Sequence, residues 1–292
     1  MILTVLSVIA PVFIVAAMGF AWTKSGMRFD AQTVSGLSTN IGMPCLVFTS
    51  LAGISVGAEE LGRIAIAGGL AMTSCALVGA IILRLAGLPL SHYLPAVAFP
   101  NLANIGLPMC LFAFGEPGLA LAMGYLMVGS LIQITMGIWL ASGKISPAGL
   151  FNNPIMYVIP IALLFRFGGY EVPQWLNDST KLAGNMALPV MLMALGASLS
   201  QIKLAGAWRS SILSLLRFAI GISVGFGIAE ILGLSGVLRS VVILQTAMPS
   251  AVFNHILALQ YDNDPETVAG IVMQSSLMSV IVLPLLLLVL LP

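Results

Sequence analysis

Two short stretches of this sequence, residues 99–108 and 247–255, place polar residues and prolines inside otherwise apolar segments. Proline lacks a backbone N–H and clashes with the carbonyl one turn back, so Pro100, Pro108 and Pro249 each release carbonyl groups from a helix. In a bilayer an unpaired backbone group costs several kcal/mol. The two stretches must therefore face each other within the protein or line a wet cavity.

The chemistry available at these breaks is the binding of a small anion. Each break starts a half-helix, whose N-terminus presents unpaired N–H groups and a partial positive charge to a carboxylate. Broken helices at matching places in two halves of a chain indicate the binding site of a transporter. The residues predicted to bind substrate are Asn101, Asn104, Pro108, Pro249, Ser250 and Asn254. For the polar members, and for Thr246, the alternative is that they only cap the broken helices.

Four further polar residues inside apolar segments are candidates for coupling or accessory roles. An unperturbed histidine titrates near neutral pH, so His255 is a candidate proton carrier; the alternative is a neutral imidazole satisfied by a backbone carbonyl. Arg217 lies eight residues beyond Arg209, about 12 Å along a helix. We expect it to snorkel to the inner face, the alternative being that it attracts an anionic substrate. Gln133 and Gln274 complete a cation or substrate site or, as we favour, form hydrogen bonds between helices.

The composition is that of a membrane protein. Hydrophobic residues make up 59% of the chain and charged residues 7%, and the mean hydropathy is +1.09. Soluble domains are roughly 25% charged, so the composition predicts a polytopic membrane protein. A net charge of +1 with no basic run argues against nucleic acid as a partner. The three cysteines fall inside apolar stretches without a CxxC pair, and no metal or other cofactor is expected.

Ten apolar stretches have the length, about 17–25 residues, that a helix needs to cross a bilayer. They are residues 2–22, 33–54, 64–86, 92–114, 118–141, 154–170, 175–198, 207–232, 238–260 and 267–290. The connections between them are short and carry most of the charged residues. Little sequence is left for a soluble domain, so we expect one transport unit over residues 1–292, located in the plasma (inner) membrane.

The second half of the chain repeats the first when it is slid back by 145 positions. Residues 40–44 (Asn-Ile-Gly-Met-Pro) then fall on residues 185–189 (Asn-Met-Ala-Leu-Pro), and Asn101 meets Thr246. The two repeats are residues 1–141 and 154–292. Each holds five spans, and because five is odd, they must have opposite orientations in the membrane, which is an inverted repeat. Six Lys and Arg residues at inner loops and flanks, against four at outer ones, favour both termini outside.

Three motifs carry a resemblance to a known family. They are Asn101-x-x-Asn104-x-Gly106-Leu107-Pro108, the run Ala247-Met248-Pro249-Ser250-Ala251-Val252 followed by Asn254 and by Ala258-x-x-Tyr261, and Asn153-Pro154. Together they resemble the auxin efflux carrier family. This family includes the plant PIN carriers and bacterial permeases labelled malonate or malate transporters, and it belongs to the broader bile-acid, arsenite and riboflavin transporter group.

The resemblance implies an all-α membrane fold of ten helices in two inverted five-helix repeats, with broken fourth and ninth helices that cross. It implies scaffold helices at residues 2–22, 33–54, 154–170 and 175–198, and transport-domain helices within residues 64–141 and 207–290. An elevator-like movement of the transport domain and a homodimer formed through the scaffold helices are further implications.

The sequence thus predicts a secondary active transporter of a small organic anion, a mono- or dicarboxylate resembling auxin, malonate or malate. Its expected mechanism is elevator-type alternating access, with a proton or sodium as the coupling ion. Two alternatives stay open: a sodium-coupled symporter of the bile-acid carrier type, and a membrane receptor that uses the same site without transport. An enzyme is not expected, because every Asp and Glu maps to a loop or a span end and no HExxH or GxSxG motif occurs.

Overall fold

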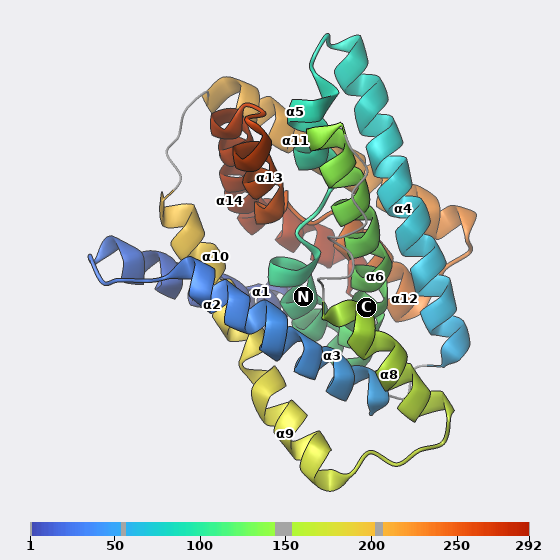
Figure 1. The fold of residues 1–292 in the computed structure, drawn as a ribbon. Coiled ribbons are helices and arrows are strands. Elements are labelled where there is room, and N and C mark those ends of the chain that lie inside the picture. The colour runs from blue at the N-terminus through green and yellow to red at the C-terminus, as the bar shows by residue number, and fades with distance from the viewer. Residues whose placement is uncertain (1, 54–56, 144–153, 202–206, 292) are drawn as a thin grey trace.

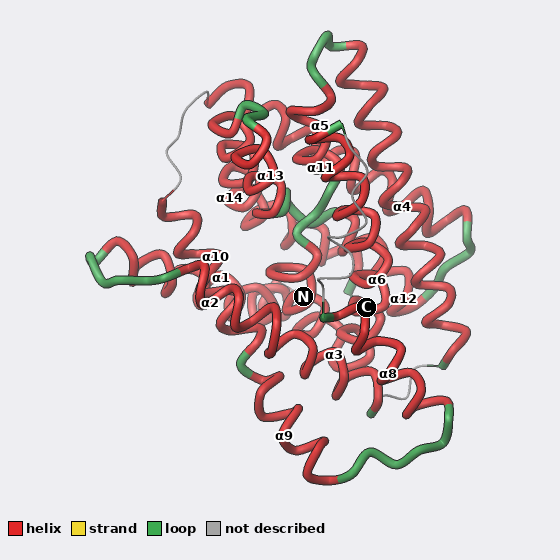
Figure 2. The backbone as a smooth tube through the Cα atoms, viewed as in Figure 1, coloured by secondary structure: helices red, strands yellow, loops and turns green. Residues whose placement is uncertain are grey.

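The computed structural model describes residues 2–53, 57–143, 154–201 and 207–291. This part of the chain is built from helices joined by short loops (Figures 1 and 2). Its one β-type pairing is an isolated antiparallel bridge between Pro100 and Ser250. Three residues used in the sequence analysis lie outside the described residues. They are Asn153 of the third motif, and Lys144 and Lys203, two of the six Lys and Arg residues predicted to lie at inner loops and flanks.

The helices of the two halves have matching interruptions. The first half contains α1 (Ile2–Lys24), α2 (Ala31–Leu37), η1 (Ser38–Gly42), α3 (Met43–Ala52), α4 (Ala58–Leu85), α5 (Leu90–Ala98), η2 (Leu102–Gly106) and α6 (Leu107–Ser142). The second half contains α8 (Ile155–Phe167), α9 (Gln174–Asn185), α10 (Ala187–Gln201), α11 (Ala207–Ile231), α12 (Gly236–Thr246), α13 (Val252–Tyr261) and α14 (Pro265–Leu290). The π-helical turn η1 precedes Pro44, and a turn at Met186 precedes Pro189. Each interruption coincides with the asparagine–proline segment that the repeat aligns.

Seven helical segments of the described residues are long and apolar enough to cross a membrane. They are Leu3–Lys24, Thr33–Ala52, Ala58–Leu85, Leu102–Ser142, Gln174–Gln201, Trp208–Ile231 and Pro265–Leu290. Ten stretches were predicted, and three account for the difference. Residues 154–170 form only the 13-residue helix α8, and residues 238–260 are divided between α12 and α13. Residues 92–114 are also divided, and their second part runs on into α6 through a bend at Gly115.

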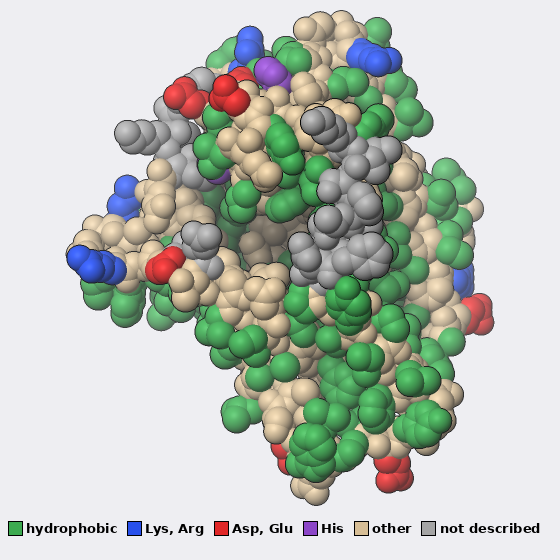
Figure 3. Space-filling model, viewed as in Figure 1, with side chains coloured by type: hydrophobic (Ala, Val, Ile, Leu, Met, Phe, Trp, Pro, Cys, Tyr) green, Lys and Arg blue, Asp and Glu red, His purple; other side chains and the backbone are tan. Residues whose placement is uncertain are grey.

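The protein is therefore a multi-pass helical membrane protein, and the ten-span inverted repeat stays a prediction. Charged side chains lie mainly at the margin of the face shown in Figure 3, and hydrophobic side chains cover much of the surface between them. Large apolar side chains are exposed along the long helices, as at Leu77 and Ile81 on α4 and Ile281 on α14. Exposed apolar surface of this extent is suited to contact with lipid.

The helices pack in two groups with sparser contacts between them. In one group α1 packs chiefly on α10, and α3 packs on α8 and α9; in the other α4 packs on α6, and α11 packs on α14 and α12. Contacts between the groups are made chiefly by α1 with α6 and α14, by α6 with α3 and α8, and by η2 with α10. The backbones of α1 and α10 touch where they cross, since a Cβ at Gly196 would lie 1.8 Å from the Ala16 carbonyl oxygen.

Candidate functional site

The two chain breaks meet at what we term the crossover, residues 99–101 paired with residues 247–251. The Asn101 N–H donates to the Pro249 carbonyl oxygen at 2.7 Å. In return, the Ala251 N–H donates to the Phe99 carbonyl oxygen at 3.3 Å. The expectation that the two stretches face each other is confirmed. Their pairing removes part of the cost of irregular backbone inside a membrane.

Asparagine side chains brace this pairing. Asn254 Nδ2 donates to the Phe99 carbonyl oxygen at 3.0 Å and to Ser250 Oγ at 3.1 Å. Asn101 Oδ1 accepts the N–H of Asn104 at 3.2 Å and so caps η2. Asn101 and Asn254 are 4% and 1% exposed. The capping role that the sequence left open is therefore present, and a part in substrate binding stays a prediction for both residues.

Each of these two amides keeps one polar atom without a protein partner in the described part of the chain. Asn101 Nδ2 is a buried donor of this kind, and Asn254 Oδ1 is a buried acceptor. Nearly all buried polar atoms in native proteins form hydrogen bonds. These two atoms therefore have bonding capacity left for a solute.

Arg217, on α11, is fully buried and directs its guanidinium into the crossover. Nε donates to the Met248 carbonyl oxygen at 3.1 Å. Nη1 donates to the carbonyl oxygens of Val97 at 3.0 Å and Ala98 at 2.9 Å, and Nη2 donates to that of Thr246. The expectation that Arg217 snorkels to the inner face is wrong.

Arg217 is buried because the chain breaks release carbonyl groups inside the protein. A guanidinium has five N–H donors in a planar fork and suits several fixed acceptors. The guanidinium therefore binds the released carbonyl groups inside the protein rather than water at the membrane surface. Close approach of α11 is also needed, and Gly221 provides it, since a Cβ there would lie 2.5 Å from the Thr246 carbonyl oxygen. All three guanidinium nitrogens are thereby engaged with the backbone.

The other predicted residues lie around the crossover in different surroundings. Pro108 is buried in the first turn of α6. His255 is half-buried, with its Nδ1 unpartnered among the described residues, and its role as a proton carrier stays a prediction. Gln133 is buried on α6, and its Nε2 has no partner in the same part of the chain. Gln274 Oε1 accepts from Ser211 Oγ at 2.7 Å, which is the favoured hydrogen bond between helices, here α14 and α11.

Two polar residues at the crossover were not predicted. Gln245, in the last turn of α12, is fully buried, and neither side-chain polar atom has a partner among the described residues. Tyr125, on α6, shares a hydrogen bond of 2.9 Å between its hydroxyl and Thr246 Oγ1. The sequence offered a signal for Gln245, because the repeat aligns it with Pro100. It offered none for Tyr125, whose partner lies 121 residues away.

A small cavity of about 210 Å³ lies beside the crossover, where residues of α2, η1, η2, α10 and α13 meet. Half-buried Asn104 lines it, together with Ser35, Thr39 and Ser198. The apolar lining residues are Met191, Ala194, Leu195, Val252, Phe253 and Ile256. A few polar groups on an apolar wall are typical of a small-molecule site.

The first turn of α13 contributes backbone donors to this small cavity. Val252 and Phe253 both line it, and neither N–H has a protein acceptor among the described residues. Open N–H groups at a helix N-terminus suit a carboxylate. Of the residues predicted to bind substrate, Asn104 lines this cavity, whereas the other polar members form hydrogen bonds within the crossover.

A larger cavity of about 510 Å³ is lined by residues of α3, α6, α9 and the first turn of α10. Its lining includes Ser50 of α3, whereas the small cavity takes Thr39 of η1. Ser50 follows Thr39 by 11 residues, about 16 Å along a helix. The other polar residues of the larger cavity are Thr49, Glu116, Asn177, Lys181 and Asn185.

Charged groups are scarce at the small cavity. Glu116 and Lys181 line the larger one, but the residues around the small cavity carry no formal charge. In the described part of the chain, no group of three or more His, Cys, Asp or Glu side chains is placed to hold a metal ion. An anion in the small cavity would be held by N–H groups and a helix dipole rather than by an ion pair.

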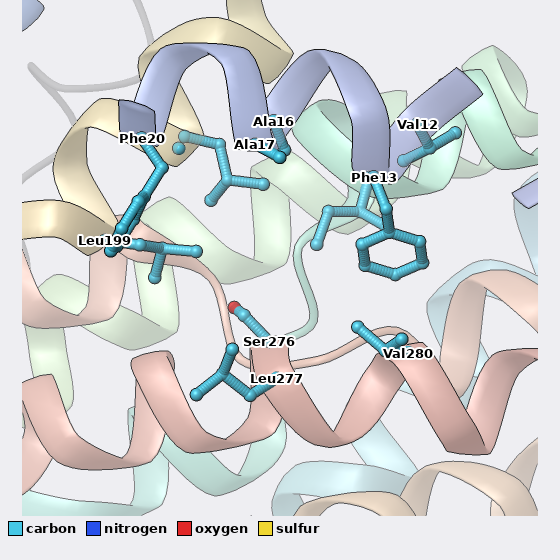
Figure 4. A pocket seen from close by; sticks show the side chains of 12 residues that line it. Val12, Phe13, Ala16, Ala17, Phe20, Leu199, Ser276, Leu277 and Val280 are labelled. Carbon is cyan, nitrogen blue, oxygen red and sulfur yellow. The ribbon is translucent and has the colours of Figure 1, made fainter. Parts of the chain in front are cut away.

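A third cavity, of about 340 Å³, lies between α1, α10 and α14 (Figure 4). Phe13 and Phe20 extend into its lining from α1, Leu199 from α10 and Val280 from α14. Ser276 supplies its single side-chain hydroxyl. A charged solute would find almost no partners here, so we do not assign the anion site to this cavity.

Known proteins resemble this chain over different lengths. Residues 138–287 match the family described as membrane transport protein. An uncharacterized transporter of Methanothermobacter thermautotrophicus is 26% identical over 303 aligned residues, covering 97% of this chain and 96% of that protein. One of Methanocaldococcus jannaschii is 27% identical over 195 residues, 63% of each chain, so the match spans just under two thirds of that relative. Auxin efflux carrier component 8 of Arabidopsis thaliana is 30% identical over 128 residues, 41% of this chain and 35% of the plant protein.

Proposed function

We propose that this chain, which belongs to the auxin efflux carrier family of membrane transport proteins, moves a small organic anion by alternating access. Membership of the family makes it a membrane transporter rather than an enzyme. The substrate class, the mechanism and the coupling are our inference from the site. The plasma membrane as its location, and a homodimer formed through the scaffold helices within residues 2–22, 33–54, 154–170 and 175–198, are parts of the same proposal.

The observation that carries the proposal is the relation between the small and the larger cavity. Shifting the numbering by 145 turns lining residues of one into lining residues of the other: Leu46 becomes Met191, Thr49 becomes Ala194, and Leu111 becomes Ile256. Two cavities whose lining residues correspond through the repeat are what an inverted repeat needs if a central site is to open to either side in turn.

The packing of the helices supports the same mechanism. α1 packs on α10 of the other half, and α8 packs on α3. The first predicted apolar stretch of each half thus packs against the second predicted stretch of the other half. The sparser contacts between the two groups of helices run along both cavities. A sliding movement of the α4–α6 and α11–α14 group against the other group would break few contacts and would close one cavity while opening the other.

The small cavity favours a carboxylate with a short hydrocarbon part. The open N–H groups of Val252 and Phe253 and the Asn104 amide suit the carboxylate, and Met191 and Leu195 suit the hydrocarbon. Without a lysine or arginine in the lining, a strong ion pair does not form. Moderate affinity of this kind permits release on the far side of the membrane.

Counterflow in proteoliposomes tests this proposal. Vesicles loaded with unlabelled malonate should accumulate labelled malonate, and a panel of mono- and dicarboxylates should compete according to fit. Loss of one hydrogen bond to a charged solute costs about 1.5–3 kcal/mol, so Asn104→Ala should raise the malonate concentration at half-saturation roughly 10- to 150-fold. The matched control is Asn40→Ala, because exposed Asn40 donates only to the Gly36 carbonyl oxygen four residues earlier, at 2.9 Å.

Two results would overturn the proposal: no carboxylate of the panel exchanges, or Asn104→Ala and Asn40→Ala behave alike. Binding without exchange would favour the receptor alternative. The sodium-coupled alternative has one observation in its favour, the buried acceptors Asn254 Oδ1 and Gln245 Oε1, which lack partners among the described residues. The position of Arg217 bears directly on that alternative.

A further inference from the structure

We propose that the Arg217 guanidinium is the resident cation of the crossover, a positioning group that holds the two broken helices together and takes the place of a bound coupling cation. The inference deepens the proposed function, since it concerns what drives transport through the same site. Its evidence is the set of contacts that Arg217 makes, which does not depend on the substrate.

The guanidinium joins the C-terminal ends of two helices from opposite halves of the chain. Val97 and Ala98 are the last residues of α5, and Thr246 is the last residue of α12, with Met248 two positions beyond it. Arg217 therefore donates to two carbonyl oxygens on each side of the crossover. No other side chain of the described residues bridges both helix ends in this way.

The charges balance without a carboxylate. A helix C-terminus carries about −0.5 elementary charge, so two converging ends supply about −1 against the +1 of the guanidinium. No carboxylate of the described residues forms an ion pair with Arg217. A buried cation without such compensation would be strongly destabilising. The ends of α5 and α12 thus provide the countercharge, and Arg217 in turn neutralises two like dipole ends that would repel each other.

This place in the fold is one that a mobile cation can also occupy. In secondary carriers, half-helix C-terminal ends and unwound backbone carbonyls coordinate the coupling ion. Here the covalently attached guanidinium occupies the four carbonyl oxygens. A sodium ion could bind these oxygens only if the Arg217 side chain moved away. The guanidinium is held in place because it is fully buried and packed close to Gly221. We infer that sodium does not bind at these helix ends during transport.

Melting temperatures in detergent, measured in sodium, choline and guanidinium chloride at equal ionic strength, test the inference without any substrate. The wild-type protein should melt at the same temperature in sodium and choline. Arg217→Ala, which opens a space among the carbonyls, should melt about 10 °C or more lower in choline. Millimolar guanidinium or sodium should restore at least half of that loss.

Two further variants separate the charge from the packing. Arg217→Met fills the space with an apolar chain and should be destabilised without rescue by any cation. Arg217→Lys retains the charge and should fall between the wild type and Arg217→Ala, which also serves if the alanine variant does not fold. Ser214→Ala is the matched control on α11: Ser214 is buried and donates to the Ile271 carbonyl oxygen at 3.2 Å, away from the crossover. The melting temperature of Ser214→Ala should be the same in all three salts.

The inference is overturned if Arg217→Met is as stable as the wild type, if Arg217→Ala and Ser214→Ala respond alike to cations, or if sodium raises the melting temperature of the wild type above that in choline. Labelled malonate uptake is then compared in the two salts. Equal uptake supports the resident cation, and sodium-dependent uptake contradicts it. If no uptake occurs in either salt, the proposed substrate fails, while the melting data still decide the role of Arg217.

Discussion

The polar side chains around the crossover divide into two sets when their hydrogen bonds are followed. Asn254 and Asn101 are buried and bond to backbone or to neighbouring side chains of the breaks. Asn104 caps nothing with its side chain in the described contacts and lines the small cavity instead. Asparagines that look alike in sequence therefore lie in different surroundings, and we propose that Asn254 and Asn101 hold the breaks while Asn104 binds substrate.

The first prediction follows from that division. Asn254→Ala removes the bonds to the Phe99 carbonyl and to Ser250 Oγ, so it should lower the free energy of unfolding by about 1–3 kcal/mol. Asn104→Ala should leave the melting temperature almost unchanged and weaken carboxylate binding. Thermal unfolding and equilibrium binding of malonate, measured on both variants, give the comparison. The reverse pattern, with Asn104→Ala the less stable variant, would contradict the assignment.

A second prediction at the residue scale concerns acid stability. Asp264, just before α14, accepts from the Tyr93 hydroxyl at 2.6 Å and from the Thr267 N–H at 3.3 Å. Burial raises the pKa of this carboxyl, but the Tyr93 and Thr267 hydrogen bonds outweigh burial and hold the pKa below its usual value. A lowered pKa in the folded state gives stability that is present above the unfolded-state value, near 4, and is lost as the pH falls through the folded-state value.

Melting temperatures of the wild type between pH 6 and pH 3 should therefore fall more steeply than those of Asp264→Asn, which cannot titrate at this position. Exposed Asp262, two residues earlier, provides the control as Asp262→Asn. Parallel curves for the wild type and Asp264→Asn would show that the hydrogen bonds of Asp264 carry no pH-dependent stability.

At the scale of the elements, the sequence indicates where helices break but not what fills the breaks. Prolines and asparagines in an apolar run predict the interruptions at residues 99–101 and 247–251, and these are present. The burial of Arg217 was not predictable from local spacing, because its acceptors lie 29 to 120 residues away and become available only when two breaks meet. The chain also bends between the predicted stretches 92–114 and 118–141, because Gly115 within α6 has the non-helical angles φ +67° and ψ −162°.

The third prediction concerns the contact between α1 and α10. A Cβ at Gly196 would lie 1.8 Å from the Ala16 carbonyl oxygen, so backbone would have to move. Gly196→Val should lower the free energy of unfolding by about 1–3 kcal/mol or more through overpacking. Gly227→Ala on α11 is the control, since a Cβ there meets no atom within 4 Å. It should be neutral or stabilising by up to about 1 kcal/mol. Equal melting temperatures of the two variants would contradict the close α1–α10 contact.

At the scale of the whole molecule, composition and the internal repeat predict more than single residues do. An apolar, charge-poor chain predicts a multi-pass membrane protein, and the family match agrees with it. The 145-residue shift, found from Asn40–Pro44 and Asn185–Pro189, also relates residues of the two cavities, which no local pattern revealed. The cavities could not be predicted because each is enclosed by helices from both halves, and sequence spacing does not give the distance between them.

The central claim is that these two cavities open to opposite faces of the membrane, and side-specific cysteine labelling tests it most directly. Lys181→Cys in the larger cavity and Ser198→Cys in the small one would be made after replacing Cys45, Cys75 and Cys110 by alanine. Right-side-out and inverted vesicles would then be treated with a membrane-impermeant maleimide, with and without malonate.

Alternating access through the crossover predicts that Lys181→Cys is labelled from one face only and Ser198→Cys from the other only. Malonate should slow the labelling of Ser198→Cys, because its carboxylate would bind beside it at the first turn of α13. Labelling of both positions from the same face would contradict the account, since two cavities that share one side of the membrane cannot pass a substrate across it.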